Sequence, residues 1–163
     1  NRRSLQPHWA AMAPPPCLIL VDLIGFKAVN DRHGHIVGDA LLCQVAERLA
    51  GAVPLPGLLI RWGGDEFAAL VPATEVGDRL RLLEAALRQP FDLGPSGGPA
   101  NVVIGARTGV SNGEGTLAAA EQAAARALLS AKACEPKAPT AVGAVPKAPT
   151  AVGAGHHRTD PRR

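Results

Sequence analysis

Two short apolar segments of this chain are separated by only four residues, Gly63-Gly64-Asp65-Glu66. Residues 58–62 and 67–71 have the length and composition of β-strands, and a short glycine-containing connection between them predicts a hairpin. A hairpin commits this part of the chain to an antiparallel sheet. It also presents two adjacent carboxylates at its tip, where a ligand can reach them.

The rest of the chain supplies the other elements of such a sheet. The apolar run at residues 17–21, ending on Asp22, predicts a strand buried on both faces. Residues 101–110 predict another strand. Helices are predicted for residues 25–32, for the stretch that follows Asp39, for residues 76–87 after a Thr74 cap, and for residues 116–132. The element order predicts an α+β fold, an α/β sandwich in which helices flank a central, mostly antiparallel sheet.

Composition divides the chain near residue 135. Residues 136–145 and 146–155 form a ten-residue repeat rich in Pro, Ala and Gly, which predicts a disordered tail over 136–163 and one domain over 1–135. The tail has a net charge of +4 and the predicted domain −1. We therefore expect no nucleic-acid partner for the domain. No apolar run approaches the roughly 18 residues of a membrane span.

Three cysteines, an odd number without metal-ligand spacing, favour a reduced, cytoplasmic protein. Cys17 and Cys43 lie in apolar runs, which predicts that both are small core residues.

Three acids are predicted to meet where these elements end. A hairpin folded beside the strand of residues 17–21 would bring Asp65 and Glu66 next to Asp22. Clustered carboxylates repel one another unless a cation neutralises them, and Mg²⁺ prefers oxygen ligands while leaving room for phosphate oxygens. Gly63 and Gly64 remove side chains where a triphosphate would approach. The residues alone therefore predict a metal-assisted phosphate site.

Each residue also has a simpler interpretation. Asp22 could merely end a strand, Asp65 and Glu66 could be turn residues, and Asp39 could be a helix N-cap. Other polar residues could cap a loop or lie on the solvated surface: Asn30, His33, His35, Lys27 and Lys132. Taken singly, each simpler interpretation stays open, and only the joint arrangement favours a phosphate site.

Two segments resemble the signatures of the GGDEF family of diguanylate cyclases. Residues 61–67 (RWGGDEF) resemble its signature hairpin, and residues 20–42 resemble its D-x-D-x-F-K-x-x-N-D-x-x-G-H-x-x-G-D segment. Residues 1–5 resemble the start of the same domain. The resemblance covers residues 1 to about 135. It implies a nucleotidyl-cyclase-like fold that condenses two GTP molecules into cyclic di-GMP and releases pyrophosphate.

The resemblance implies a role for each matching residue. Mg²⁺ (or Mn²⁺) would be held by Asp22, Asp65, Glu66 and the Leu23 carbonyl oxygen. Asp65 and Glu66 would be catalytic, with Asp65, or a water on its metal, helping to deprotonate the 3′-hydroxyl group. The substrate-binding residues would be Asn30 and Asp39 at guanine, Lys27 and His35 beside the nucleotide, and Gly63, Gly64 and Lys132 at the phosphates.

The resemblance also implies partners. Each domain would hold one GTP, so catalysis would need a second GGDEF domain facing the first in a homodimer. Such domains usually follow a sensory or receiver domain, which we expect to be missing upstream of Asn1. The implied setting is bacterial signalling in the cytoplasm.

Several departures support a second hypothesis. Ile24 stands where the family has its second acid, and Arg107 where it has a small polar residue. The last helix keeps Lys132 but loses the family's Asp and Tyr, and Glu135-Pro136-Lys137 replaces Gly-Arg-Asn. The alternative is a degenerate, catalytically inactive GGDEF domain that acts as a GTP-binding or protein-interaction module. A third hypothesis, a basic nucleic-acid binder, rests on the tail alone.

Overall fold

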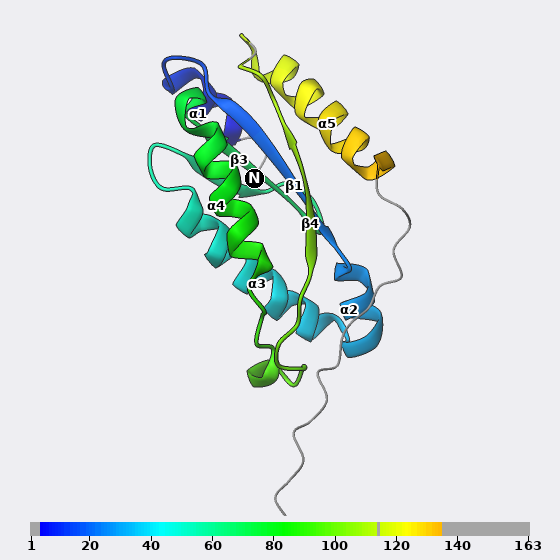
Figure 1. The fold of residues 1–163 in the computed structure, drawn as a ribbon. Coiled ribbons are helices and arrows are strands. Elements are labelled where there is room, and N and C mark those ends of the chain that lie inside the picture. Colours follow the sequence, from blue (N-terminus) through cyan, green and yellow to red (C-terminus); the bar gives the residue numbers. More distant parts are fainter. Residues whose placement is uncertain (1–3, 114, 135–163) are drawn as a thin grey trace, which may run out of the picture.

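The computed structural model describes residues 4–113 and 115–134 of the 163-residue chain (Figure 1). Their order of elements alternates helices with the strands of one sheet. The elements are α1 (Leu5–Ala11), β1 (Cys17–Ile24), α2 (Phe26–His33), α3 (His35–Ala52), β2 (Leu58–Arg61), β3 (Glu66–Val71), α4 (Val76–Arg88), β4 (Gly105–Val110) and α5 (Leu117–Cys134). Two 3₁₀ turns, η2 (Ala73–Glu75) and η3 (Gly94–Ser96), lie before and after α4.

The four strands form one sheet in the order β2-β3-β1-β4, and every neighbouring pair is antiparallel. The β1–β3 register runs from Cys17 opposite Val71 to Asp22 opposite Glu66. Strands β2 and β3 pair as the predicted hairpin. The structure thus confirms the predicted α+β fold with its antiparallel sheet.

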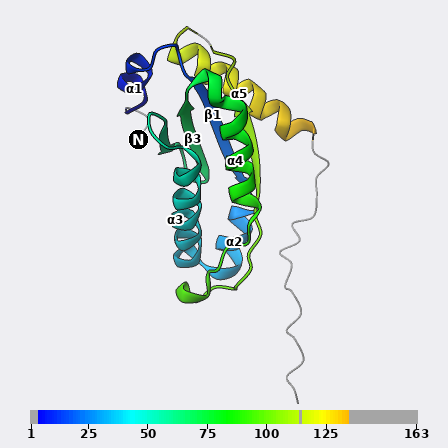
Figure 2. The same ribbon diagram turned by 60° about the vertical axis from the view of Figure 1, so that its left-hand side comes forward.

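One face of the sheet carries the larger core. Ile19, Val21 and Leu23 of β1 point toward this face and are buried with the apolar residues of α3 and α4. Figure 2 shows α3 and α4 on the same side of the strands. Alternate residues of a strand face opposite sides, so the neighbours of these three belong to the other face.

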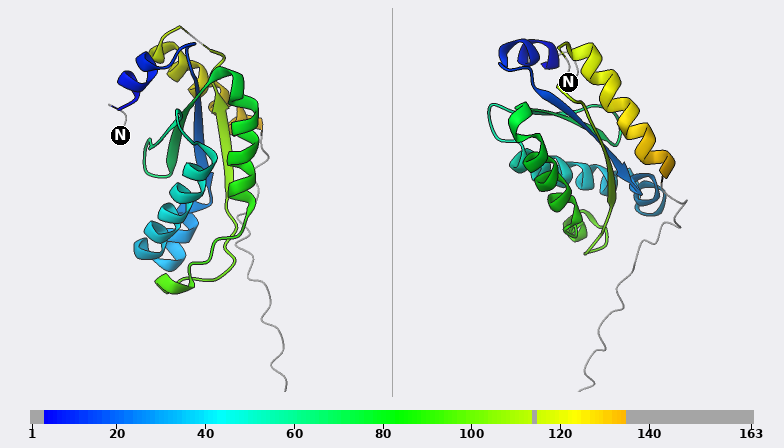
Figure 3. Two further views of the ribbon diagram at one scale, coloured as in Figure 1. Left: turned by 90° about the vertical axis from the view of Figure 1, so that its left-hand side faces the viewer. Right: turned by 45° about the horizontal axis from the view of Figure 1, so that its top comes forward.

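The opposite face is covered by α5 and α1. Leu18 and Leu20 of β1 pack there with Leu5 and Trp9 of α1 and with apolar residues of α5. The right-hand view of Figure 3 shows the sheet between α5 and the α3–α4 pair. Helix α5 lies very close to β4, because a Cβ atom on Gly109 would overlap the carbonyl oxygen of Ala124. Asp22, two residues after Leu20, faces α5.

Some predicted boundaries were wrong. Strand β1 does not end at Asp22 but continues to Ile24, because Leu23 and Ile24 pair with β4. The predicted strand over residues 101–110 starts only at Gly105; before it, Val102 forms an isolated bridge with Phe91. Helix α1 was not predicted.

The structure also contradicts the predicted Thr74 cap, the alternative interpretation of Asp39 as an N-cap and the predicted burial of Cys43. Helix α3 starts at His35, so Asp39 lies inside it and is no N-cap. Thr74 lies in η2, and α4 follows Glu75 without a side-chain cap. Cys17 is buried as predicted, but Cys43 is exposed.

The predicted tail, residues 136–163, lies outside the described residues. Within the described part, no helix has the length and apolar character that crossing a bilayer requires.

Candidate functional site

Backbone hydrogen bonds fix the acidic hairpin against the central strand. The amides of Trp62 and Gly63 both donate to the Glu66 carbonyl oxygen, at 2.8 and 3.2 Å, which closes the turn. The Leu23 amide donates to the Asp65 carbonyl oxygen at 3.1 Å. The backbones of Asp65 and Glu66 therefore lie beside Asp22 and Leu23, as the sequence predicted.

The Arg61 side chain makes hydrogen bonds that hold this turn. Its Nε donates to the carbonyl oxygens of Gly63 and Gly64, both at 3.1 Å, and its Nη2 donates to Gly64 at 2.7 Å. Hydrogen bonds from a charged guanidinium are stronger than neutral ones, so Arg61 stabilises the conformation of the turn. The sequence motif contains Arg61 but does not predict this role.

Asp22 is buried and ion-paired. Lys132 Nζ of α5 donates to Asp22 Oδ1 at 2.9 Å, and Arg107 Nη1 of β4 lies 3.6 Å from Asp22 Oδ2. Two cations from distant parts of the chain therefore converge on one carboxylate. The sequence predicted Lys132 as a site residue but gave no sign that Arg107 reaches Asp22, because that contact depends on the β1–β4 register.

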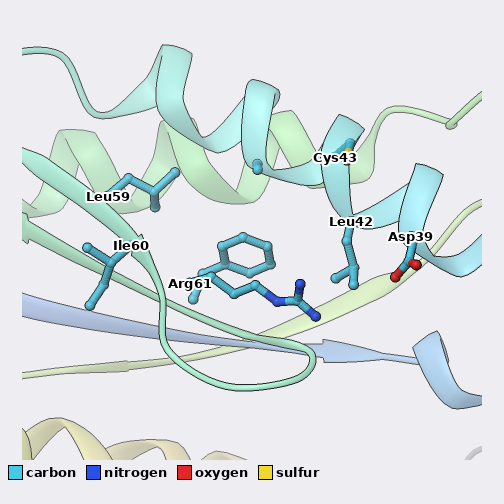
Figure 4. Close-up of a pocket in the computed structure, with 8 residues that line it drawn as sticks. Asp39, Leu42, Cys43, Leu59, Ile60 and Arg61 are labelled. Carbon is cyan, nitrogen blue, oxygen red and sulfur yellow. The ribbon is translucent and has the colours of Figure 1, made fainter. Parts of the chain in front are cut away.

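A pocket of about 460 Å³ opens between α3 and the hairpin. Its volume is within the usual range for small-ligand sites. The pocket is lined by Asp39, Leu42, Cys43, Ala46, Leu59, Ile60, Arg61 and Phe67. Figure 4 shows Asp39 at one end, Leu59 and Ile60 at the other, and the Arg61 side chain between them. A mostly apolar pocket with one carboxylate at its end suits a flat, partly polar ring.

Asn30 of α2 packs against α3 at Gly38, the residue before Asp39. Its Oδ1 atom is buried and has no hydrogen-bond partner among the described residues. It lies against Gly38, the neighbour of Asp39, so closely that a Cβ atom on Gly38 would overlap it. Buried acceptors are nearly always paired, so this unpaired one makes Asn30 a candidate binding group.

Two more of the predicted substrate residues are solvent-facing. Lys27 of α2 and His35 at the start of α3 are exposed, and neither has a hydrogen bond or ion pair to another described residue. Gly64 has open space where a Cβ would be, whereas a Cβ on Gly63 would lie 3.0 Å from Glu66 Oε2.

The predicted metal ligands fit a divalent cation by type and by backbone position. Asp22 and Glu66 are direct cross-strand partners, Asp65 precedes Glu66, and carboxylate oxygens suit Mg²⁺. Their side chains do not converge, however. The described residues contain no group of three or more His, Cys, Asp or Glu side chains placed to hold a metal ion. The Asp22 carboxylate instead contacts Lys132 and Arg107.

An antiparallel α+β domain with an acidic Gly-Gly turn beside a central-strand carboxylate defines the nucleotidyl-cyclase type of fold. The model of the family described as diguanylate cyclase, GGDEF domain, matches residues 2–136. This chain belongs to that family.

Relatives agree with this assignment. The chain is 43% identical over 79 residues to the bifunctional diguanylate cyclase/cyclic di-GMP phosphodiesterase MucR of Pseudomonas aeruginosa, a match that covers 47% of this chain and 12% of MucR. The matched segment is thus a small part of that relative.

Solved structures resemble the whole domain. A sensory box/GGDEF family protein from Caulobacter crescentus CB15 superposes with a TM-score of 0.67 at 35% identity, covering 82% of this chain and 92% of that one. The diguanylate cyclase SiaD from Pseudomonas aeruginosa, solved with its activator SiaC, gives 0.70 at 28% identity, covering 82% and 55%.

Proposed function

We propose that this domain condenses two molecules of GTP into cyclic di-GMP. The 3′-oxygen of one GTP attacks the α-phosphorus of the other, pyrophosphate leaves, and the same step repeated in the opposite direction closes the ring. Family membership supports the reaction class. The observation that carries the proposal for this chain is the backbone pairing of the Gly-Gly-Asp-Glu turn with β1 at Asp22 and Leu23.

The pocket supports recognition of guanine. The Asp39 carboxylate can accept hydrogen bonds from guanine N1–H and its exocyclic amine. We assign Asn30, whose amide lies against the neighbouring Gly38, to the same base. Apolar side chains such as Leu42 and Phe67 would cover the ring faces. Lys27 and His35 would flank the nucleotide from the exposed ends of their helices.

The phosphate groups would lie over the turn. Gly63 and Gly64 bring the backbone close to them, Lys132 provides a positive charge, and Asp65 accepts the proton of the attacking 3′-hydroxyl group with Glu66 beside it. Asp22, Asp65, Glu66 and the Leu23 carbonyl oxygen would hold Mg²⁺ or Mn²⁺. When bound, that cation neutralises charge that develops on the phosphates.

Asp65→Asn tests the proposal. The variant keeps the size of the side chain but loses its charge, so we expect cyclic di-GMP formation to fall at least about a hundredfold while the melting temperature stays near that of the parent. The assay incubates protein with GTP and Mg²⁺ and quantifies cyclic di-GMP by chromatography. Asp78→Asn, an exposed change on α4, is the matched control and should keep full activity.

Two results would contradict the proposal. Undiminished product formation by Asp65→Asn would remove Asp65 from catalysis. GTP binding by the parent chain without product, even after enforced dimerisation, would favour the alternative of a catalytically inactive regulatory module.

We further propose the setting that this reaction requires. The partners would be GTP and a second GGDEF domain in a face-to-face homodimer, because each domain supplies one substrate. A sensory or receiver domain upstream would supply the input, and the cytoplasm, which holds GTP, would be the location.

A further inference from the structure

Three neighbouring strands place charged side chains in one row beneath α5. Glu66 of β3, Asp22 of β1 and Arg107 of β4 are direct cross-strand partners. Direct partners in an antiparallel sheet point to the same face. That face is covered by α5, from which Lys132 reaches Asp22. The row thus connects the proposed catalytic hairpin to the positively charged side chains of Arg107 and Lys132.

The contacts around Asp22 are partly shielded from water. The exposed fractions of the side chains are 13% for Asp22, 23% for Arg107 and 36% for Lys132. Ion pairs at such positions are weakened by solvent less than surface pairs are. Lys132 and Arg107 therefore compete effectively with any other cation for the Asp22 carboxylate.

The formal charges of this row balance. Glu66 and Asp22 contribute two negative charges, and Arg107 and Lys132 two positive charges. Strand β1 adds no second carboxylate, since Ile24 faces the same side as Asp22 and packs against Gly105. A divalent cation that approached Asp22 without a nucleotide would meet a row of zero net charge. The carboxylate that should bind it would already be in contact with two positively charged groups.

We propose that Arg107, together with Lys132, occupies the Asp22 carboxylate in the nucleotide-free domain, so that a divalent cation binds there appreciably only together with the phosphate groups of the nucleotide. This inference rests on the proposed function. Phosphate oxygens offer Lys132 and Arg107 new partners, and Asp22 is then released to the cation. Arg107 is in this sense a positioning residue that couples cation binding to nucleotide binding.

Binding of Mn²⁺ to the full chain without nucleotide tests this directly, with the free ion counted by electron paramagnetic resonance. Arg107→Thr leaves the row with a net negative charge, so Mn²⁺ should bind at least about tenfold more tightly than to the parent. Arg126→Thr, an exposed change on α5, removes the same charge elsewhere and should leave the affinity unchanged. Adding Asp22→Asn to Arg107→Thr should abolish the gain.

The thermodynamic coupling between Mn²⁺ binding and GTP binding supplies a second readout. If Arg107 couples the two ligands, GTP raises the Mn²⁺ affinity of the parent by a larger factor than that of Arg107→Thr, and Mn²⁺ raises GTP affinity correspondingly. Arg107→Lys keeps the charge and should keep the coupling. Thermal melting of each variant verifies that it is folded.

The outcomes separate this inference from the proposed function. If the parent and Arg107→Thr bind Mn²⁺ equally without nucleotide, or if Arg126→Thr gains as much, the role of Arg107 is refuted while the metal site at Asp22 stands. If no variant binds Mn²⁺ even with GTP, the metal assignment of the proposed function fails, and this inference fails with it.

Discussion

Gly38 illustrates how one hydrogen atom in place of a methyl group shapes this site. The Asn30 amide occupies the space where a side chain at position 38 would be, and this contact joins α2 to α3 beside Asp39. Glycine is a poor helix former, so Gly38 lowers the stability of α3. The Asn30 contact nevertheless requires glycine, because a side chain at position 38 would overlap the Asn30 amide.

Gly38→Ala should separate folding from recognition. Alanine improves helix propensity by about 1 kcal/mol but displaces the Asn30 side chain. We expect GTP affinity, measured by calorimetry, to fall about tenfold, the loss of roughly one hydrogen bond.

Gly51→Ala is the control for this change. Gly51 is also in α3, and nothing lies within 4 Å of its added Cβ. That variant should be more stable by up to about 1 kcal/mol with unchanged GTP affinity. If Gly38→Ala bound GTP like the parent, Asn30 would have no part in recognising the base.

At the scale of elements, sequence patterns predicted the parts whose signals are local. The hairpin followed from its turn residues, the part of α3 after Asp39 from its apolar spacing, and α5 from its alanine-rich composition. The end of β1 could not be predicted, because Leu23 and Ile24 are ordered by pairing with β4, over eighty residues away. Helix α1 was not predicted because it is only seven residues long and contains Pro7, although Leu5 and Trp9 have helical spacing and are both buried.

The site shows the same division. The motifs predicted that Asp65 and Glu66 lie next to Asp22, and the backbone positions agree, although their carboxylates do not form a metal-binding group among the described residues. The ion pair between Arg107 and Asp22 depends on the strand register. The hydrogen bonds from Arg61 depend on the conformation of the turn. Neither is encoded in the spacing of residues.

The packing of α5 on β4 carries a prediction at this scale. A Cβ on Gly109 would overlap Ala124 O and lie 2.5 Å from Leu128 N, both backbone atoms that no rotamer change can move. Gly109→Ala should therefore lower the free energy of unfolding by roughly 3 kcal/mol, measured by urea denaturation. It should also weaken the Lys132–Asp22 contact, because α5 must move.

Gly77→Ala provides the comparison. Nothing lies within 4 Å of a Cβ on Gly77, in the first turn of α4, so this variant should not lose stability. Equal stability of the two variants would mean that α5 is not tightly packed on β4.

At the scale of the whole molecule, one strand connects both cores. Alternate side chains of β1 pack in the core with α3 and α4 and in the core with α1 and α5. Asp22 lies on the same face as the residues of the second core. We propose residues 1–135 as the folding unit, since described structure extends through α5. The tail over residues 136–163 stays a prediction of disorder.

Dimerisation should control activity. If each domain supplies one GTP, the rate of cyclic di-GMP formation per mole of protein should rise with protein concentration. A dimerising segment fused ahead of Asn1 should remove that dependence. A constant specific activity on dilution, with a monomeric species in light scattering, would exclude the face-to-face arrangement.

The two indoles of this chain have an optical consequence. There is no tyrosine, so fluorescence at wavelengths longer than the weak phenylalanine emission comes only from Trp9 and Trp62. Trp9 is buried in α1, whereas Trp62 is half-buried and directly precedes Gly63 of the turn. A Trp9→Phe protein would thus carry a single tryptophan, beside the turn that we propose binds the phosphate groups. Nucleotide arrival could then be followed in real time, without a label, as a change in emission from one known position.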